Sequence, residues 1–356
     1  MNDTIKLGNQ PVGSGCPPFI VAEMSGNHNQ SLDRALRIVQ AAADAGVNAV
    51  KLQTYTADTL TIDADGDDFI IHNSHSPWRG KSLYELYKEA YTPWEWHQPI
   101  FEKCRELGLV AFSTPFDEKA VDFLEKLDVP AYKISSFENN HLPLIRKAAS
   151  TGKPLIISTG TADITEIAEA VETARLFGCN EIILLKCTSS YPAPPEESNL
   201  LTIPHMKDLF GTPVGISDHT LGVGVSIASI ALGAALIEKH FTISRTEGGV
   251  DSPFSMEPDE MRLLVEEAAK AFRAIGSVVY KSVVYKSAGA EETSARFKRS
   301  VYVVDNVKKG DSFTENNLRI IRPGFGLAPK YLPVLLNKRA SCDIKRGTAM
   351  SWDFIE

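Results

Sequence analysis

The sequence predicts a (β/α)8 TIM barrel, an α/β fold, followed by a small β-rich domain. Short apolar runs rich in β-branched residues recur eight times between about residues 18 and 241, and most precede a segment of helical period. Strands that alternate with helices form parallel sheets with right-handed crossovers, and eight such units favour closure into a barrel. After about residue 291 the sequence changes to short strand-like runs broken by Gly and Pro. The length of 356 residues also suits one large domain and one small domain.

The elements of the barrel follow from local signals in chain order. The helix after the first strand has Ser31 as its expected N-cap and Gly46 at its end. After the fifth strand, Asp163 and Glu166 have the spacing of a capping box, and Gly178 closes the helix. These helices are expected to form the outer ring, with a last helix at residues 261–275. The eight expected strands are 19–22, 49–52, 109–112, 131–134, 155–158, 181–185, 213–216 and 235–238.

The domain boundaries are predicted from length and texture. We expect a barrel domain at residues 1–276, a linker at 277–292 and a small β-rich domain at 293–356. The segment 56–92 is too long for an ordinary connection between a strand and a helix. It is therefore expected to be a lid or a binding loop.

Composition excludes several classes of protein. The sequence is 43% hydrophobic and 23% charged, with no apolar run long enough to cross a bilayer. The N-terminus lacks the basic and apolar regions of a secretory signal, which predicts a cytoplasmic protein without a membrane anchor. Its five cysteines are scattered and contain no Cys-x-x-Cys pair, so neither a disulfide framework nor a zinc site is expected. The net charge of -8 argues against a nucleic-acid partner.

Charged and hydroxyl side chains stand at the carboxyl end of every predicted strand. In a barrel of this kind the active site is built at these ends. Lys51 and Lys133 lie within their apolar runs and should point inward, where they favour anion binding; Lys186 and Lys239 could join them. Two other interpretations stay open on these residues alone, namely ion pairs at the barrel rim and a lysine that forms a Schiff base with a carbonyl substrate.

Two histidines form a second group of candidates. His219 and His240 follow the seventh and eighth strands, which are neighbours in a closed barrel. Two imidazoles with Glu23, Glu238 or Asp251 nearby suit a divalent ion such as manganese. The sequence therefore predicts a metal site at the same end of the barrel as the lysines.

The segments around these strand ends resemble the sialic acid synthase family, and the resemblance extends over nearly the whole chain. The matching segments include Ile20-Val21-Ala22-Glu23, Ala49-Val50-Lys51-Leu52-Gln53-Thr54, Phe112-Ser113-Thr114-Pro115-Phe116, Gly215-Ile216-Ser217-Asp218-His219 and Glu238-Lys239-His240-Phe241-Thr242. The resemblance implies a β/α barrel followed by an antifreeze-like (SAF) domain. It also implies condensation of phosphoenolpyruvate with an acetamido sugar and release of phosphate, catalysed with a divalent metal, most often Mn2+, with Mg2+ or Co2+ as alternatives.

The resemblance assigns roles to particular residues. Glu23, His219 and His240 would be catalytic, and the two histidines would bind the metal. Arg322 would contact the substrate of a partner protomer in a domain-swapped homodimer. The residues implied to hold phosphoenolpyruvate are Lys51, Thr114, Lys133, Ser136, Ser158, Ser189 and Ser217, and those implied to face the sugar are Gln53, Tyr191, Glu238, Asp251 and Arg322.

Within the family, the sequence most resembles the pseudaminic acid branch. This similarity lies in the segments 25–30, 188–191 and 248–252, and it implies a 2,4-diacetamido-2,4,6-trideoxy altrose as the sugar. The family's asparagine after Cys-Thr is Ser189 here, which argues against N-acetylneuraminate as the product. Legionaminic, N-acetylneuraminic and spore-coat polysaccharide synthases are the alternatives within the family. A Schiff-base aldolase and a carbohydrate-binding scaffold without catalysis are alternatives of other classes.

Overall fold

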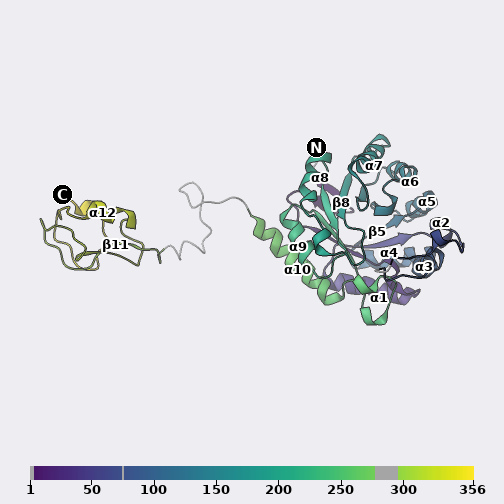
Figure 1. The fold of residues 1–356 in the computed structure, drawn as a ribbon, viewed down its shortest axis with the longest axis horizontal. Helices are drawn as coiled ribbons and strands as arrows, with labels where there is room; N and C mark the ends of the chain where they lie inside the picture. The colour runs from purple at the N-terminus through teal and green to yellow at the C-terminus, as the bar shows by residue number, and fades with distance from the viewer. Residues whose placement is uncertain (1–3, 74–75, 277–295) are drawn as a thin grey trace. The chain divides into compact units, whose positions relative to one another are not determined.

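The computed structural model describes residues 4–73, 76–276 and 296–356 and confirms the predicted barrel (Figure 1). Its eight strands are all parallel and close in the order β10-β3-β4-β5-β6-β7-β8-β9. All eight apolar runs form strands, and several extend by one or two polar residues at the carboxyl end. The strands are β3 (Phe19–Glu23), β4 (Ala49–Thr54), β5 (Val110–Pro115), β6 (Tyr132–Ile134), β7 (Leu155–Ser158), β8 (Ile182–Cys187), β9 (Val214–Ser217) and β10 (Leu236–His240).

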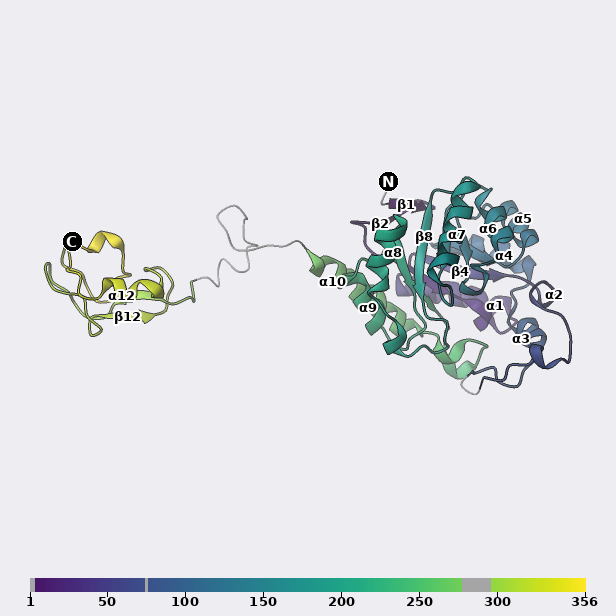
Figure 2. The same cartoon turned by 45° about the horizontal axis from the view of Figure 1, so that its top comes forward.

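Helices surround the strands, as both ribbon views show (Figures 1 and 2). Ser31 accepts a hydrogen bond from the amide of Arg34, and Gly46 ends the first ring helix in a left-handed conformation with φ 86°. Asp163 and Glu166 form the expected capping box at the start of α7. The helices of this unit are α1 (Leu32–Ala45), α2 (Ala57–Leu60), α3 (Leu83–Ala90), α4 (His97–Glu106), α5 (Glu118–Lys126), α6 (Leu142–Ala149), α7 (Ile164–Leu176), α8 (Thr202–Phe210), α9 (Gly224–Ala231) and α10 (Pro258–Ile275).

An N-terminal hairpin, absent from the sequence prediction, closes the amino end of the barrel. It consists of β1 (Thr4–Leu7) and β2 (Gln10–Gly13), which pair antiparallel and lie beside α8 in Figure 2. Its apolar residues Ile5, Leu7 and Val12 are buried in one cluster with the inward-facing residues of the strands, such as Phe19 and Phe112. The interior below the polar mouth is therefore a packed core, because its open end is covered by apolar side chains.

Contacts divide the chain into two compact units, Met1–Gly276 and Ser277–Glu356. The second unit has its own apolar core around Val301, Val303, Phe313 and Leu335. Its strands β11 (Ser300–Val303) and β12 (Leu318–Ile321) pair antiparallel, and α12 (Leu332–Leu335) is its short helix. The predicted linker at 277–292 lies outside the described residues. In the described part of the chain, no helix combines the length and apolar character needed to cross a membrane.

Candidate active site

Two lysines and two glutamates form a buried charge cluster at the carboxyl ends of β3, β4, β6 and β10. Lys51 Nζ lies 2.7 Å from Glu23 Oε2 and 3.8 Å from Glu238 Oε2. Lys133 Nζ lies 3.6 Å from Glu238 Oε1. All four side chains are nearly inaccessible to solvent. Because burying an unpaired charge is costly, these lysines and carboxylates stabilise one another's ionised forms.

The pKa values of the two carboxyl groups in this cluster are shifted in opposite directions by their surroundings. Burial raises the pKa of Glu23, and Lys51 offsets that effect only in part. For Glu238, burial also opposes ionisation, but Lys133 and Lys51 outweigh it and lower the pKa. Two carboxyl groups with opposite pKa shifts in one site suit two roles. Glu238 is fitted to remain ionised between the lysines, and Glu23 is fitted to exchange a proton.

Hydroxyl groups surround the lysine ends. Lys51 Nζ donates to Thr114 Oγ1 at 3.1 Å, and Lys133 Nζ donates to Ser158 Oγ at 2.6 Å. Ser217 Oγ donates to Glu238 Oε1 at 3.1 Å. The structure thus brings together three of the hydroxyl residues that the resemblance assigns to phosphoenolpyruvate. Ammonium groups beside hydroxyls are the donors that a phosphate or carboxylate group requires.

Ser136 and Ser189 both approach the side of Gly160 that a Cβ would occupy, in the turn that follows β7. The amide of Gly160 donates to Ser136 Oγ at 3.1 Å. A Cβ at position 160 would lie 2.2 Å from Ser189 Oγ and 2.7 Å from Ser136 Oγ. Glycine is therefore required here for close approach of the two hydroxyls to the backbone. Sequence analysis named both serines but gave no role to Gly160, whose importance depends on a contact between loops.

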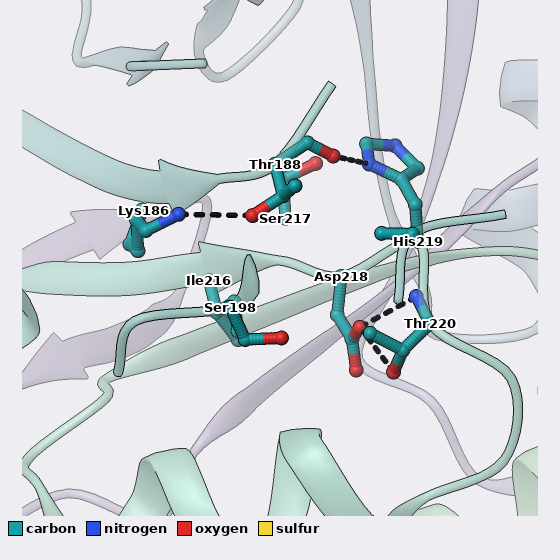
Figure 3. Close-up of a pocket in the computed structure, with 9 residues that line it drawn as sticks. Lys186, Thr188, Ser198, Ile216, Ser217, Asp218, His219 and Thr220 are labelled. Atoms are coloured by element: carbon teal, nitrogen blue, oxygen red, sulfur yellow. Dashed lines mark hydrogen bonds between the residues drawn. The ribbon is translucent and has the colours of Figure 1, made fainter. Parts of the chain in front are cut away.

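The two candidate metal ligands lie next to each other, near the charge cluster. The ring centroids of His219 and His240 are 5.4 Å apart. His219 Nδ1 lies 3.0 Å from the carbonyl oxygen of Thr188, to which it can donate a hydrogen bond, drawn as a dashed line in Figure 3. His240 Nδ1 lies 3.7 Å from Asp251 Oδ2. Burial, His219 and the nearby lysines lower the pKa of His240 well below its ordinary value, so its imidazole is neutral.

A neutral imidazole is the form that binds a divalent metal. His240 Nδ1 is buried and has no hydrogen-bond partner among the described residues. Within that same part of the chain, no group of three or more His, Cys, Asp or Glu side chains is arranged to hold a metal. The residues present therefore fit a metal that takes two imidazole ligands from the protein and fills its remaining positions with water or substrate oxygen.

The other two lysines lie outside the charge cluster. Lys239 alternates with Glu238 and His240 along β10, and its Nζ pairs with Asp218 Oδ2 at 3.1 Å. Lys186 Nζ donates to Thr188 Oγ1 at 3.0 Å and is directed toward it in Figure 3. Neighbouring side chains on a strand point to opposite faces, so these positions face away from the mouth. Of the four lysines, only Lys51 and Lys133 contact the two buried glutamates at the mouth.

Aromatic rings stand beside the histidine pair. The Tyr191 ring lies 4.5 Å from His219, and Phe254 lies 5.0 Å from His240. Trp78, from the segment 56–92, lies 5.7 Å from Tyr191 and donates its indole N–H to the carbonyl of Val250 at 2.8 Å. The segment predicted to be a lid or binding loop thus contributes a ring to this aromatic group. No sequence signal identified Phe254, which packs here because of the turn after Asp251.

Two predicted sugar contacts also lie at the mouth. Gln53 Nε2 donates to Glu23 Oε1 at 3.2 Å. Asp251 is buried, and burial raises its pKa to about 6. Arg322 lies on the second unit, where its side chain is exposed, and its contribution to the site stays a prediction.

Comparison with known proteins agrees with this architecture. The NeuB family model matches residues 38–280, and the SAF domain model matches residues 298–356. The chain is 41% identical to "Pseudaminic acid synthase" of Helicobacter pylori, over 96% of this chain and 98% of that protein. It is 36% identical to "N,N'-diacetyllegionaminic acid synthase" of Legionella pneumophila, over 98% of each chain. The crystal structure of "Spore coat polysaccharide biosynthesis protein spsE" from Bacillus subtilis matches with a TM-score of 0.67 and 35% identity, covering 99% of both chains.

The fold and the site define the class of protein. It is a β/α barrel with buried lysine, glutamate and histidine side chains at its mouth, followed by a small SAF domain. The extent of the match to the family model and to relatives above 30% identity then identifies it further. The chain belongs to the NeuB family.

Proposed function

We propose that this chain is a phosphoenolpyruvate-dependent nonulosonic acid synthase that makes pseudaminic acid. Its substrates would be phosphoenolpyruvate and 2,4-diacetamido-2,4,6-trideoxy-β-L-altropyranose, and phosphate would leave by C–O cleavage. The observation that carries the proposal is the buried cluster of two lysines and two glutamates, whose charges act on the nearby His219 and His240 pair. The similarity to pseudaminic acid synthases at 41 to 42% identity supports the choice of sugar.

The anionic substrate would be held by Lys51 and Lys133. Their hydroxyl partners Thr114 and Ser158 would hold the phosphate or carboxylate oxygens. Ser136 and Ser189 would add two more donors beside Gly160. Fixing the enol in this way places its C3 toward the histidine pair and converts a two-substrate encounter into a near-unimolecular step.

The carbon–carbon bond would form when C3 of phosphoenolpyruvate attacks the aldehyde carbon of the open-chain sugar. His219 and His240 would hold the divalent metal that family membership implies, Mn2+ by preference, and bound there it would polarise the aldehyde as a Lewis acid. Gln53, Tyr191 and Asp251 would orient the sugar. Positive charge would then develop at C2 of the former enol, close to the carboxylate of Glu238.

The former aldehyde oxygen would take up a proton and become a hydroxyl. Water would add at C2, and Glu23 would accept its proton. The raised pKa of Glu23 suits this role, since a general base works best when its pKa approaches the working pH. The tetrahedral intermediate would then lose phosphate as its C–O bond breaks, which leaves the 2-keto acid. No covalent bond to the protein forms in this sequence of steps.

The test is phosphate release from phosphoenolpyruvate with a panel of acetamido sugars, with Mn2+ and after chelation. Metal-dependent release with the diacetamido-trideoxy altrose and not with N-acetylmannosamine would support the proposal. Release with the legionaminic precursor or N-acetylmannosamine would retain the reaction and change the sugar. No release with any sugar, together with borohydride trapping of a lysine, would replace the condensation with Schiff-base chemistry.

We also propose a homodimer in which the mouth of the barrel is covered and Arg322 of each protomer serves the other's site. Large apolar side chains at the starts of the ring helices support it: Phe137, Ile164, Leu201 and Leu221 are 61%, 56%, 75% and 63% exposed. These four residues follow β6, β7, β8 and β9 in turn, so they share one end of the barrel, and apolar surface gathered in this way marks an interaction surface. Analytical ultracentrifugation tests the proposal, because Leu201→Glu with Leu221→Glu should yield monomers if this rim is buried between protomers.

A further inference from the structure

Ser25 contacts two acidic groups of the mouth, Glu23 and Asp251. It opens the 3-10 helix Ser25–His28, which follows β3 directly. Its amide donates to Glu23 Oε1 at 3.0 Å. Its hydroxyl donates a short hydrogen bond to Asp251 Oδ2. Ser25 therefore connects the candidate general base Glu23 to Asp251, which lies 226 positions after Ser25 in the chain.

The carboxylate of Asp251 lies beside His240, one of the two candidate metal ligands. Asp251 Oδ2, the oxygen that accepts from Ser25, is also the atom 3.7 Å from His240 Nδ1. The amide of Gly26 also acts to lower the pKa of Asp251. Asp251 makes no hydrogen bond to His240 Nδ1, but a buried carboxylate this close to it attracts a cation, so Asp251 would affect metal affinity at the histidine pair.

The backbone at Ser25 is held in an uncommon conformation. Its φ is 45°, in the left-handed region, although it is not a glycine and is only 3% exposed. Met24 before it is right-handed, with φ -74° and ψ -39°. Successive right-handed and left-handed residues aim consecutive amides at one concave point and so bind anions. Here the amides of Ser25 and Gly26 serve Glu23 and Asp251, so the unusual backbone has a direct consequence for two acidic groups.

We propose that Ser25 is a positioning residue for the sugar half-reaction: its amide sets the rotamer of Glu23, and its hydroxyl holds Asp251 against His240. This inference rests on the proposed synthase activity. Substituting Ser25 should therefore impair use of the sugar and weaken metal binding at the histidine pair. Binding of phosphoenolpyruvate should change little, because its predicted ligands lie on β4, β5, β6, β7 and β9 and in the loops after β6 and β8, and none of them is bonded to Ser25.

The experiment compares Ser25→Gly, Ser25→Cys and wild type. Glycine keeps the amide and tolerates the left-handed φ, so it removes the hydroxyl without backbone strain. We expect kcat/KM for the sugar to fall about 10- to 100-fold in Ser25→Gly, as for loss of a hydrogen bond to a charged group. KM for phosphoenolpyruvate should stay within about twofold of wild type. Cysteine is a weak hydrogen-bond donor of similar size, so kcat/KM for the sugar in Ser25→Cys should lie between the values for wild type and Ser25→Gly.

Mn2+ binding supplies a readout that does not depend on turnover. Titration followed by the electron paramagnetic resonance signal of free Mn2+ should show affinity about tenfold weaker in Ser25→Gly. The control is Asp128→Gly, which also relieves a left-handed residue, with φ 52°, at the opposite end of the barrel. That variant should match wild type in both assays. Ser25→Gly should still unfold in one cooperative transition, a few degrees below wild type at most, because relief of the left-handed strain offsets part of the lost hydrogen bond.

The outcomes separate the two proposals. Wild-type sugar kinetics and Mn2+ affinity in Ser25→Gly would overturn the role of Ser25 and leave the synthase proposal intact. If wild type binds Mn2+ but releases no phosphate with any sugar, the synthase proposal fails, and the Mn2+ affinities alone decide the role of Ser25. If wild type neither turns over nor binds Mn2+, both proposals fall.

Discussion

The ion pair between Asp218 and Lys239 should carry a large share of the stability of the barrel mouth. Both side chains are 1% exposed. Lys239 Nζ donates to Asp218 Oδ2 at 3.1 Å, to the carbonyl of Thr220 at 2.7 Å and to that of Gly222 at 3.0 Å. Asp218 in turn accepts from the hydroxyl of Ser226 at 2.5 Å. This network fixes the residues that immediately precede His219 and His240.

Replacing Lys239 by methionine would leave a buried carboxylate and two carbonyl groups without their cation. Breaking a buried pair in this way costs about 3 to 5 kcal/mol. In a unit of this size each kcal/mol lowers the midpoint of thermal unfolding by about 2 to 4 °C, so Lys239→Met should unfold about 6 to 20 °C below wild type. Adding Asp218→Asn should recover part of the loss, because the uncompensated charge is removed.

Differential scanning calorimetry of the full chain measures this change in the transition of the barrel unit. The matched control is Lys270→Met, which breaks an exposed pair with Glu267 whose side chains are 57% and 39% exposed. An exposed pair contributes about 0.2 to 1 kcal/mol, so the control should shift by only a few degrees. A Lys239→Met shift no larger than that of the control would refute the reasoning.

Three further predictions concern the aromatic group beside the site, the buried His97 and the candidate metal ligand His219. Trp78→Ala should reduce kcat/KM for the sugar at least about tenfold through loss of its packing on Tyr191 and its hydrogen bond to Val250; Trp94→Phe, a half-buried indole packed on Phe123, is the control, and equal effects would contradict the role of Trp78. Burial lowers the pKa of His97 to about 4 in the folded protein. As the pH falls below 6.5, the unfolded state therefore takes up a proton that the folded state does not. The free energy of unfolding should decrease by up to about 3 kcal/mol between pH 6.5 and pH 4. His97→Gln should flatten this slope, unlike His72→Gln at an exposed site, and an unchanged slope would refute the assignment. His219→Gln should abolish the Mn2+ dependence of phosphate release and weaken Mn2+ binding by at least about tenfold, whereas wild-type affinity would remove His219 from the metal site.

The sequence alone determined the barrel and most of its contents. Alternation of β-branched runs with capped amphipathic helices is a local property, so it predicted the eight strands and helix ends such as Ser31 and Gly46 without any tertiary information. The carboxyl ends of parallel strands meet on one face, and Glu23, Lys51, Lys133 and Glu238 were therefore expected together before any distance was known.

Only the tertiary structure decided which of these side chains touch. The sequence already predicted that Lys51 and Lys133 point inward, but it left Lys239 open. The structure pairs Lys239 with Asp218, because one residue of register moves a side chain to the opposite face. Ser25 gave no sequence signal of its own, since its role depends on a left-handed backbone and a partner in a distant loop. Trp78 was recognised only as part of a long insert. Contacts between residues far apart in sequence follow from loop packing, which local propensity does not encode.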